Sequence, residues 1–445
     1  MRKLILLFLP YILCAQSANY NITPLDSVAF KGYFRTSLGQ SDGGKTMVNF
    51  ATPGGLSHYR LGNEPNTYAE VQFSYNRKLD LESKKSFDLV FMLAGYSGFG
   101  DQQPFKLENV TQLYAKMNNA IGNSDVWIGR RYYERRDHHI IDYFWYSPGQ
   151  GATVGAGIEN IRGKNHKDDI TIAAFNFENK NVRTLSSDEN NNEKGVLQNY
   201  ILETKWKDIY FSKNSSITFW NRLSTRQKNN INYDKINGYG FGIWYDQTNM
   251  FKGQAYNTIQ ISYRKGNSIG KNLAPIYETS ESELLYSYDM KKTYVLEASN
   301  QFTFEKEKVF AINAVALYRY EDRGVVPYNI ITNEKIGDGK QIHWFSLGSR
   351  MIKYLTRHFN LALEVGTDYI DNQTISRKGW LNKFTFAPQL SWDYGFYSRP
   401  VLRPFITYAK WSDNLIGDIG NAPNEKVFNN SNNGMTYGLS FEIWW

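Results

Sequence analysis

The chain ends on Leu439-Ser440-Phe441-Glu442-Ile443-Trp444-Trp445, where apolar and polar residues alternate up to an aromatic last residue. Successive side chains of a β-strand point to opposite faces, so the four apolar residues at odd-numbered positions would share one face. That face is apolar enough to meet lipid, whereas the last strand of a soluble β-sandwich gains little from an exposed terminal tryptophan. The segment favours the closing strand of a membrane-spanning barrel, with a soluble sandwich as the alternative.

The same alternation recurs along the whole chain. It is found in residues 28–39, 67–77, 86–96, 107–117, 170–178, 216–226, 238–246, 258–264, 310–320, 344–354, 360–369, 381–392, 399–411 and 436–445. Some connections are short (119–124, 393–395) and others are long and polar (40–62, 186–194, 322–340, 412–434). Short turns at one end and long loops at the other are typical of an outer-membrane barrel. At roughly 24 residues per strand and connection, the pattern predicts a single-domain, all-β, antiparallel transmembrane barrel of about 18 strands.

The composition agrees with an exported β-protein. Aromatic residues make up 16% of the chain, an enrichment that favours β-structure. The mean hydropathy of -0.53 is compatible with a barrel, because only alternate residues of its strands face lipid. The formal net charge of +8 is scattered, and no Lys/Arg run of the kind that binds nucleic acid is present. We therefore expect either a bacterial outer-membrane barrel or a soluble secreted β-protein.

The first residues have the form of a secretory signal peptide. Arg2 and Lys3 precede an apolar run over 4–13, and small residues follow up to Ala18. The run is shorter than the ~20 residues that span a bilayer as a helix. We predict a cleaved signal over 1–18 and a barrel domain over 19–445. Cys14 is the single cysteine, so the mature chain would hold no disulfide; lipidation at Cys14 is an alternative that its neighbour Leu13 disfavours.

Several strands place an aromatic ring on their polar face. The pairs that share a face are Tyr33 with Arg35, Tyr68 with Glu70, Trp220 with Arg222, Tyr397 with Arg399, and Trp444 with Glu442. In a barrel this face points into the lumen. An aromatic ring binds the apolar C–H face of a sugar, while charged and amide groups bind its hydroxyl rim. The pattern predicts weak, successive sugar sites along a channel; the alternative is that inward rings fill the barrel or pack against an infolded loop.

The densest charge cluster lies in residues 128–144, which include two adjacent histidines, His138 and His139. We predict a loop folded into the lumen, with an exposed surface loop as the alternative. Adjacent residues on a strand point apart, and no Cys or suitably spaced His completes a ligand set, so we expect no metal site and no cofactor. No persuasive Ser/His/Asp arrangement indicates an enzyme.

These residues resemble the maltoporin family of carbohydrate-specific porins. The matching stretches, in the family's order, are residues 32–35, 59–64, 67–70, 129–142, 155–160, 398–400, 407–411 and 442–445. The resemblance is good over the first ~140 mature residues and the final ~50, and rests only on pattern in between. It implies an 18-stranded barrel, a homotrimer and an inward-folded third loop.

The resemblance also implies two sets of sugar-binding residues. An aromatic slide would consist of Tyr33, Tyr68, Tyr397 and Trp444, with Tyr256 added through the alignment of Lys252-Gly253. A polar track beside it would consist of Arg35, Arg60, Glu70, Lys106, Arg135, Asp137 and Asp142. Oligosaccharides similar to maltodextrins and the outer-membrane lipid would be the partners.

The sequence departs from the family at several of these positions. The tyrosine of the constriction is replaced by Phe144, which cannot donate a hydrogen bond. One track arginine is Lys106, which loses bidentate geometry. The aromatic residue that a neighbouring subunit would contribute falls near Phe99, and Pro65 lies near a position of the missing first-loop disulfide. The preferred sugar can therefore differ from maltodextrins.

Three other functions compete with a sugar-specific porin. A general diffusion porin would lack the inward aromatic row. A soluble secreted carbohydrate-binding β-protein would use the same residue types without a membrane. A barrel lipase would need a converging Ser and His that the sequence does not reveal, and the chain is too short to hold both the plug and the larger barrel of a TonB-dependent transporter.

Overall fold

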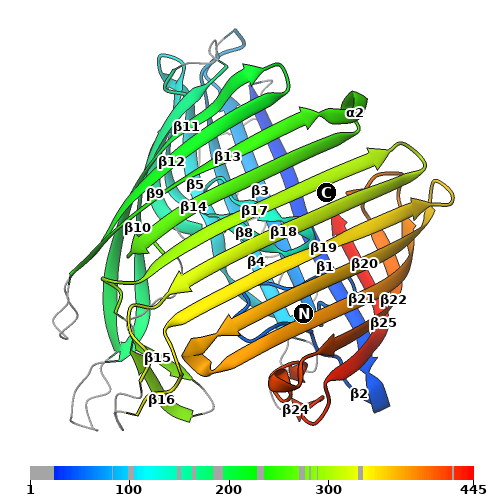
Figure 1. Cartoon of the computed structure of the whole chain (residues 1–445). Coiled ribbons are helices and arrows are strands. Elements are labelled where there is room, and N and C mark those ends of the chain that lie inside the picture. The colour runs from blue at the N-terminus through cyan, green and yellow to red at the C-terminus, as the bar shows by residue number, and fades with distance from the viewer. Residues whose placement is uncertain are drawn as a thin grey trace, which may run out of the picture.

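The computed structural model describes residues 25–82, 84–98, 105–147, 152–162, 167–183, 194–227, 235–269, 276–279, 282–287, 289–328, 334–422 and 425–445. Eighteen strands in these residues form one closed antiparallel barrel (Figure 1). They are β1 (Asp26–Ser41), β3 (Asn66–Lys78), β4 (Ser86–Gly98), β5 (Lys106–Ile121), β6 (Ser124–Tyr132), β9 (Ala152–Glu159), β10 (Asp169–Arg183), β11 (Lys194–Ser212), β12 (Ser215–Arg226), β13 (Ile236–Asn249), β14 (Ala255–Gly266), β17 (Tyr294–Lys306), β18 (Phe310–Asp322), β19 (Gln341–Tyr354), β20 (Phe359–Asn372), β21 (Arg377–Ser391), β22 (Val401–Trp411) and β25 (Asn433–Trp444).

The barrel closes because the first and last strands pair with each other. Tyr33 of β1 stands opposite Glu70 of β3 on one side and opposite Trp444 of β25 on the other. Every other barrel strand pairs with its neighbours in sequence, so the barrel has no free edge. The predicted architecture is confirmed, and each alternating segment named above overlaps one barrel strand, with ends that differ by up to five residues. A soluble β-sandwich is excluded.

Four strands, β6, β9, β11 and β17, were not among the predicted segments. The reason is clearest for β9, which alternates alanine and valine with glycine. A Cβ atom on Gly155 would lie 2.7 Å from the Phe175 ring and 3.2 Å from the Trp127 ring, and one on Gly157 would lie 2.6 Å from Trp127 Nε1. Gly155 and Gly157 are therefore glycine because large rings of the barrel interior cover these inward positions. Without polar side chains there, β9 lacks the alternation of polar and apolar residues that identifies a strand in the sequence.

The connections differ at the two ends of the barrel, as predicted. At the turn end they are residues 79–85, 122–123, 160–168, 213–214, 250–254, 307–309, 355–358 and 392–400. At the loop end they are residues 42–65, 99–105, 133–151, 184–193, 227–235, 267–293, 323–340, 373–376 and 412–432. The loop end, at the bottom of Figure 1, carries β2 (Lys45–Thr46), β15 (Ile276–Thr279), β16 (Ser282–Ser287), β23 (Asn421–Ala422) and β24 (Glu425–Lys426), whereas α2 (Met250–Gly253) lies at the turn end.

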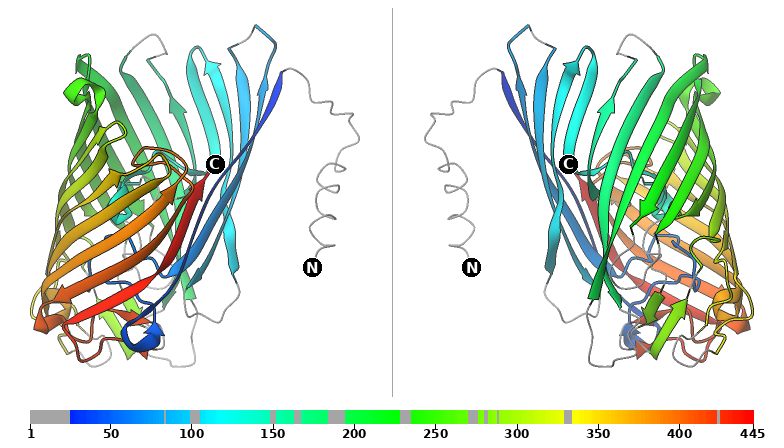
Figure 2. Two further views of the ribbon diagram at one scale, coloured as in Figure 1. Left: turned by 90° about the vertical axis from the view of Figure 1, so that its right-hand side faces the viewer. Right: turned by 90° about the vertical axis from the view of Figure 1, so that its left-hand side faces the viewer.

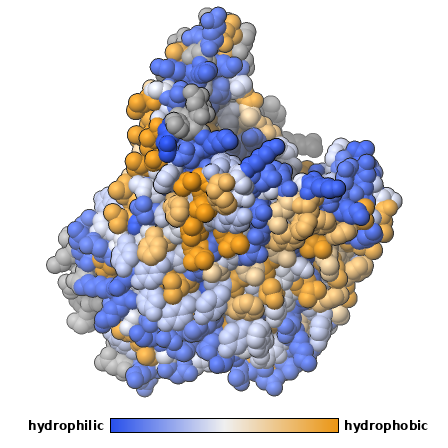
Figure 3. All heavy atoms as spheres, turned by 45° about the horizontal axis from the view of Figure 1, so that its top comes forward, coloured by the Kyte–Doolittle hydropathy of each residue, from blue (hydrophilic) through white to orange (hydrophobic). Residues whose placement is uncertain are grey.

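The outer wall carries aromatic side chains near both ends of the barrel. At the loop end, the ring centroids of Tyr239 and Tyr263 are 6.0 Å apart, and those of Tyr263 and Tyr294 are also 6.0 Å apart. At the turn end, those of Phe304 and Phe310 are 5.6 Å apart. Exposed aliphatic side chains lie on the wall between them, and Figure 3 shows such apolar patches. Two aromatic girdles flanking an apolar band are typical of a membrane barrel. Among the described residues, no helix has the length and apolar character to cross a bilayer.

Loops fold into the barrel and narrow its interior (Figure 2). The third loop contains β7 (Arg136–His138), η2 (His139–Ile141) and β8 (Tyr143–Tyr146), and its Ile140 has 0% exposure. Tyr143 OH donates a 2.5 Å hydrogen bond to Glu297 on the wall strand β17. The predicted inward third loop is confirmed, and the alternative of an exposed surface loop is excluded.

The first loop folds inward as well, which the sequence analysis did not predict. Tyr59 is 1% exposed and its hydroxyl lies 3.1 Å from Ser346 Oγ on β19. The Leu61 amide donates a 2.9 Å hydrogen bond to Glu364 on β20. The third loop thus covers the inner wall around β11–β17, and the first loop covers β19 and β20, so the remaining passage lies against β25, β1 and β3.

Candidate functional site

Three of the predicted slide residues lie next to each other on neighbouring strands. The ring centroids of Tyr68 and Tyr33 are 6.1 Å apart. Those of Tyr33 and Trp444 are 6.4 Å apart, and the two ring planes differ by only 25°. The strand register brings them together, because Tyr33 pairs with Trp444 and the inward face of β3 carries Tyr68. The rings form one surface on the inner wall, and each is partly exposed.

The line of rings continues toward the turn end through a residue of the third loop. The His139 ring lies 6.2 Å from the Trp444 ring and 5.3 Å from the Tyr397 ring, meeting both edge to face. The hydroxyls of Tyr397 and Tyr256 are 2.9 Å apart. Burial and the neighbouring Arg60 guanidinium lower the pKa of His139, so its ring is neutral at neutral pH. All five predicted slide residues therefore lie on one continuous line from the loop end to the turn end.

One carboxylate, that of Glu442, organises the polar groups beside Trp444. Its Oε1 accepts a 2.9 Å hydrogen bond from Tyr33 OH and lies 3.5 Å from Arg60 Nη2. Its Oε2 lies 2.7 Å from both Arg399 Nη2 and Arg403 Nη2. Glu442 is 7% exposed. A buried carboxylate is stable there because cations and hydroxyls satisfy both of its oxygens.

A second carboxylate, Glu64 of the first loop, joins two predicted track residues. Arg60 Nε donates to Glu64 Oε1 over 2.8 Å, and Arg35 Nη1 forms an ion pair with the same oxygen. Arg35 also lies 3.7 Å from Asp142 Oδ2 and donates a 3.2 Å hydrogen bond to Asn66. The track residues Arg35, Arg60 and Asp142 are therefore brought together by the infolded loops.

The remaining track residues are placed less uniformly. Glu70 accepts a 2.5 Å hydrogen bond from Tyr68 OH, at the loop end of the slide. Asp137 is partly buried in β7, where burial and the nearby Asp142 raise its pKa. The backbone of Lys106 begins β5, but its side chain lies outside the described part of the structure, as does Phe99.

Phe144, at the predicted constriction, packs against an arginine. The Arg135 guanidinium carbon lies 3.5 Å from the Tyr132 ring centroid and 4.7 Å from the Phe144 centroid. Phe144 is 39% exposed. The two rings hold Arg135 between them, an arrangement that favours a stacked guanidinium. At the predicted constriction, the side chains therefore present the ring of Phe144 and the guanidinium of Arg135.

The third loop removes one inward ring from the passage. Trp220 is 5% exposed, and its ring lies 5.5 Å from that of Tyr146. For Trp220, packing against an infolded loop is thus the correct interpretation. The sequence analysis did not place Glu64, His139 or Glu442 in the site; Glu442 and Arg399 had been recognised only as inward-facing neighbours of aromatic rings.

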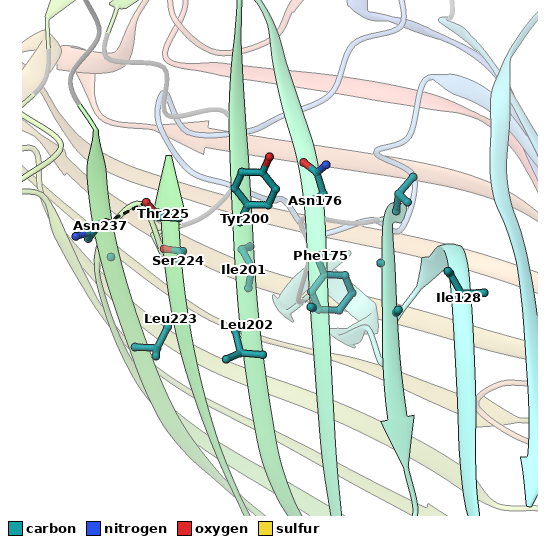
Figure 4. A pocket seen from close by; sticks show the side chains of 15 residues that line it. Ile128, Phe175, Asn176, Tyr200, Ile201, Leu202, Leu223, Ser224, Thr225 and Asn237 are labelled. Atoms are coloured by element: carbon teal, nitrogen blue, oxygen red, sulfur yellow. Dashed lines mark hydrogen bonds between the residues drawn. The ribbon is translucent and has the colours of Figure 1, made fainter. Parts of the chain in front are cut away.

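The described part of the outer wall contains a groove of 750 Å³ on β6 and β9–β13 (Figure 4). Its lining includes Ala174, Leu202 and Leu223 as well as the polar residues Asn176 and Thr225. Leu202 and Leu223 face away from the lumen, with exposures of 45% and 58%. The groove is therefore separate from the line of rings. Within the described residues, no cluster of His, Cys, Asp or Glu could hold a metal ion.

A closed antiparallel barrel with an apolar outer wall and a loop-narrowed lumen defines a channel of the porin class. The family model described as LamB porin matches residues 28–445. The chain therefore belongs to the LamB porin family and is an outer-membrane porin.

Solved structures that match most of this chain share little sequence with it. The outer membrane channel DcaP of Acinetobacter baumannii is 10% identical, with a TM-score of 0.46 and coverage of 96% of this chain and 100% of that one. OccAB1 of Acinetobacter baumannii is 10% identical, with a TM-score of 0.47 and coverage of 94% and 96%. OmpF of Salmonella typhi, in complex with daunomycin, is 11% identical, with a TM-score of 0.44 and coverage of 94% and 98%.

Proposed function

We propose that this porin is sugar-specific and gives facilitated diffusion of maltodextrin-like oligosaccharides. The single observation that carries the proposal is the continuous line of rings from Tyr68 through Tyr33, Trp444 and Tyr397 to Tyr256. A sugar ring can leave one aromatic face only after it has begun to contact the next. Each contact is weak enough to release, as conduction requires.

The polar groups beside the rings suit the hydroxyl rim of a sugar. Arg35 and Arg60 both pair with Glu64, and Arg35 also lies 3.7 Å from Asp142 Oδ2. Their guanidinium N–H groups are donors and the carboxylate oxygens are acceptors for hydroxyl groups. The polar track can therefore bind the hydroxyls of an oligosaccharide while its rings pass along the aromatic line.

Export and assembly complete the proposal. Residues 1–18 would be the cleaved export signal and 19–445 the mature domain; the signal lies outside the described residues. The homotrimer is carried over from the family and is tested by the mass of the purified complex in detergent.

Conductance in planar bilayers tests the proposed function. Added maltodextrins should block the wild-type channel in a saturable way. Trp444→Ala should weaken the block about two- to tenfold, because an aromatic contact contributes roughly 0.5–1.5 kcal/mol beyond area burial. Trp445→Ala is the matched control, since Trp445 faces outward with 45% exposure and should leave the block unchanged. An ohmic conductance that no sugar reduces would instead identify a general diffusion porin.

A further inference from the structure

A buried guanidinium lies against the ring of Trp444. The guanidinium carbon of Arg399 is 4.3 Å from the ring centroid, the distance of a stacked cation–π contact. The Arg399 side chain is only 4% exposed, whereas Trp444 is partly exposed. The exposed part of the Trp444 ring is therefore the side that Arg399 does not cover, and that side faces the passage.

Arg399 is itself held in place by a dense set of acceptors. Its Nε and Nη2 donate to Glu442 Oε2 over 2.8 and 2.7 Å. Its Nη1 donates to the carbonyl oxygens of Ser398 at 2.9 Å and Phe396 at 3.4 Å. A guanidinium with this many fixed partners has little rotamer freedom, so it forms a rigid support for the ring above it.

The same carboxylate also fixes the next ring of the line. Glu442 Oε1 accepts the hydroxyl of Tyr33, and Oε2 accepts Arg399. Glu442 therefore holds Tyr33 directly and holds Trp444 through Arg399, and the two ring planes differ by only 25°. Tyr397 belongs to the same turn as Arg399, two residues earlier, so the turn that supports Trp444 also supplies the next ring.

We infer that Arg399 is a positioning residue for sugar binding, an inference that rests on the proposed sugar transport. Arg399 touches no sugar. It stacks beneath Trp444 and, through Glu442, holds Trp444 and Tyr33 in one binding surface. Neither the resemblance to the maltoporin family nor the alternation of inward and outward residues along the strands assigns this role to Arg399. Its effect is on sugar affinity, while the width of the open channel is set by other groups.

Arg399→Lys tests this role, because lysine retains the positive charge but loses the planar fork and the stacked contact. Arg403→Lys is the matched control: Arg403 is also buried, lies at the same 2.7 Å from Glu442 Oε2, and has no stacked ring among the described residues. Three quantities are measured in each variant. Bilayer recordings give the binding constant for maltodextrin block and the open-channel conductance without sugar. Fluorescence gives the acrylamide quenching of Trp444, isolated by subtracting a Trp444→Phe background.

For Arg399→Lys we expect a three- to tenfold weaker block, unchanged conductance without sugar, and increased quenching of Trp444. Arg403→Lys should keep block, conductance and quenching close to wild type. Equal losses in both variants would overturn the inference, because they would show a general effect of charge or folding. Unchanged block and quenching in Arg399→Lys would overturn it as well. If sugars fail to block the wild-type channel, the proposed function fails, and the quenching data still decide whether Arg399 orients the ring.

Discussion

The Tyr59 ring packs flat against two glycines of the inner wall, Gly348 and Gly366. The substitution Gly366→Ala should prevent this packing. Gly348 and Gly366 face each other across β19 and β20. A Cβ atom on Gly366 would lie 2.1, 2.3 and 2.5 Å from Cδ2, Cε2 and Cγ of the Tyr59 ring. Carbon atoms pack at about 3.5 Å or more, so the ring must move by about 1.4 Å. The ladder hydrogen bonds hold the strands, and the first loop therefore moves instead.

The displacement reaches the lumen because Arg60 follows Tyr59 directly. Arg60 Nη2 donates to Tyr33 OH of β1 over 2.9 Å, and Glu64 of the same loop forms an ion pair with Arg35 of β1. A shift of about 1.4 Å carries such contacts beyond hydrogen-bond range. Overpacking of this kind costs about 1–3 kcal/mol, enough to change the ratio of docked to undocked first loop by about five- to more than a hundredfold.

Single-channel recording measures the outcome. Gly366→Ala should raise the open-channel conductance and the current noise, and weaken maltodextrin block, because the first loop no longer narrows the passage. Gly240→Ala is the control on an inward-facing strand position, where the nearest contact of a new Cβ would be 3.1 Å, to the Cγ atom of an arginine. Wild-type conductance and block in Gly366→Ala would refute both the packing of Tyr59 against the glycines and its effect on the polar track.

Three further outcomes follow from the loops and the wall. Phe144→Tyr adds a hydroxyl beside Arg135 and should strengthen maltodextrin block several-fold, as measured by titration of the conductance. Glu203→Gln leaves Arg222, its 2.6 Å ion-pair partner, without a counter-charge, and should lower stability by about 3–5 kcal/mol in urea titrations of the detergent-solubilised barrel. Burial lowers the pKa of His138 to about 4, below the 6.5 of an unfolded histidine, so the docked third loop should be most stable above pH 6.5 and lose stability as the pH falls toward 4. Channel noise recorded against pH should rise over that window in wild type and less in His138→Asn; equal profiles would contradict the assignment.

Local alternation was sufficient to predict the barrel, its antiparallel order and its two kinds of connection. Side chains of a strand alternate between its two faces, so the sequence of each strand indicates which face meets lipid and which meets the lumen. The same period placed Tyr33, Tyr68 and Trp444 on inward faces before any register was known. It did not predict β6, β9, β11 and β17; at β9, glycines stand at inward positions packed against Trp127, so polar and apolar residues do not alternate.

Only the tertiary structure decided which inward groups reach the passage. Trp220 and Trp444 have the same signature in sequence, yet the third loop buries the first and leaves the second partly exposed. The convergence of Arg60 from the first loop, Arg399 from a turn and Glu442 from the last strand depends on how far each loop folds inward. Contacts between residues more than 300 positions apart arise from barrel closure and loop packing, and a local pattern of faces contains no information about either.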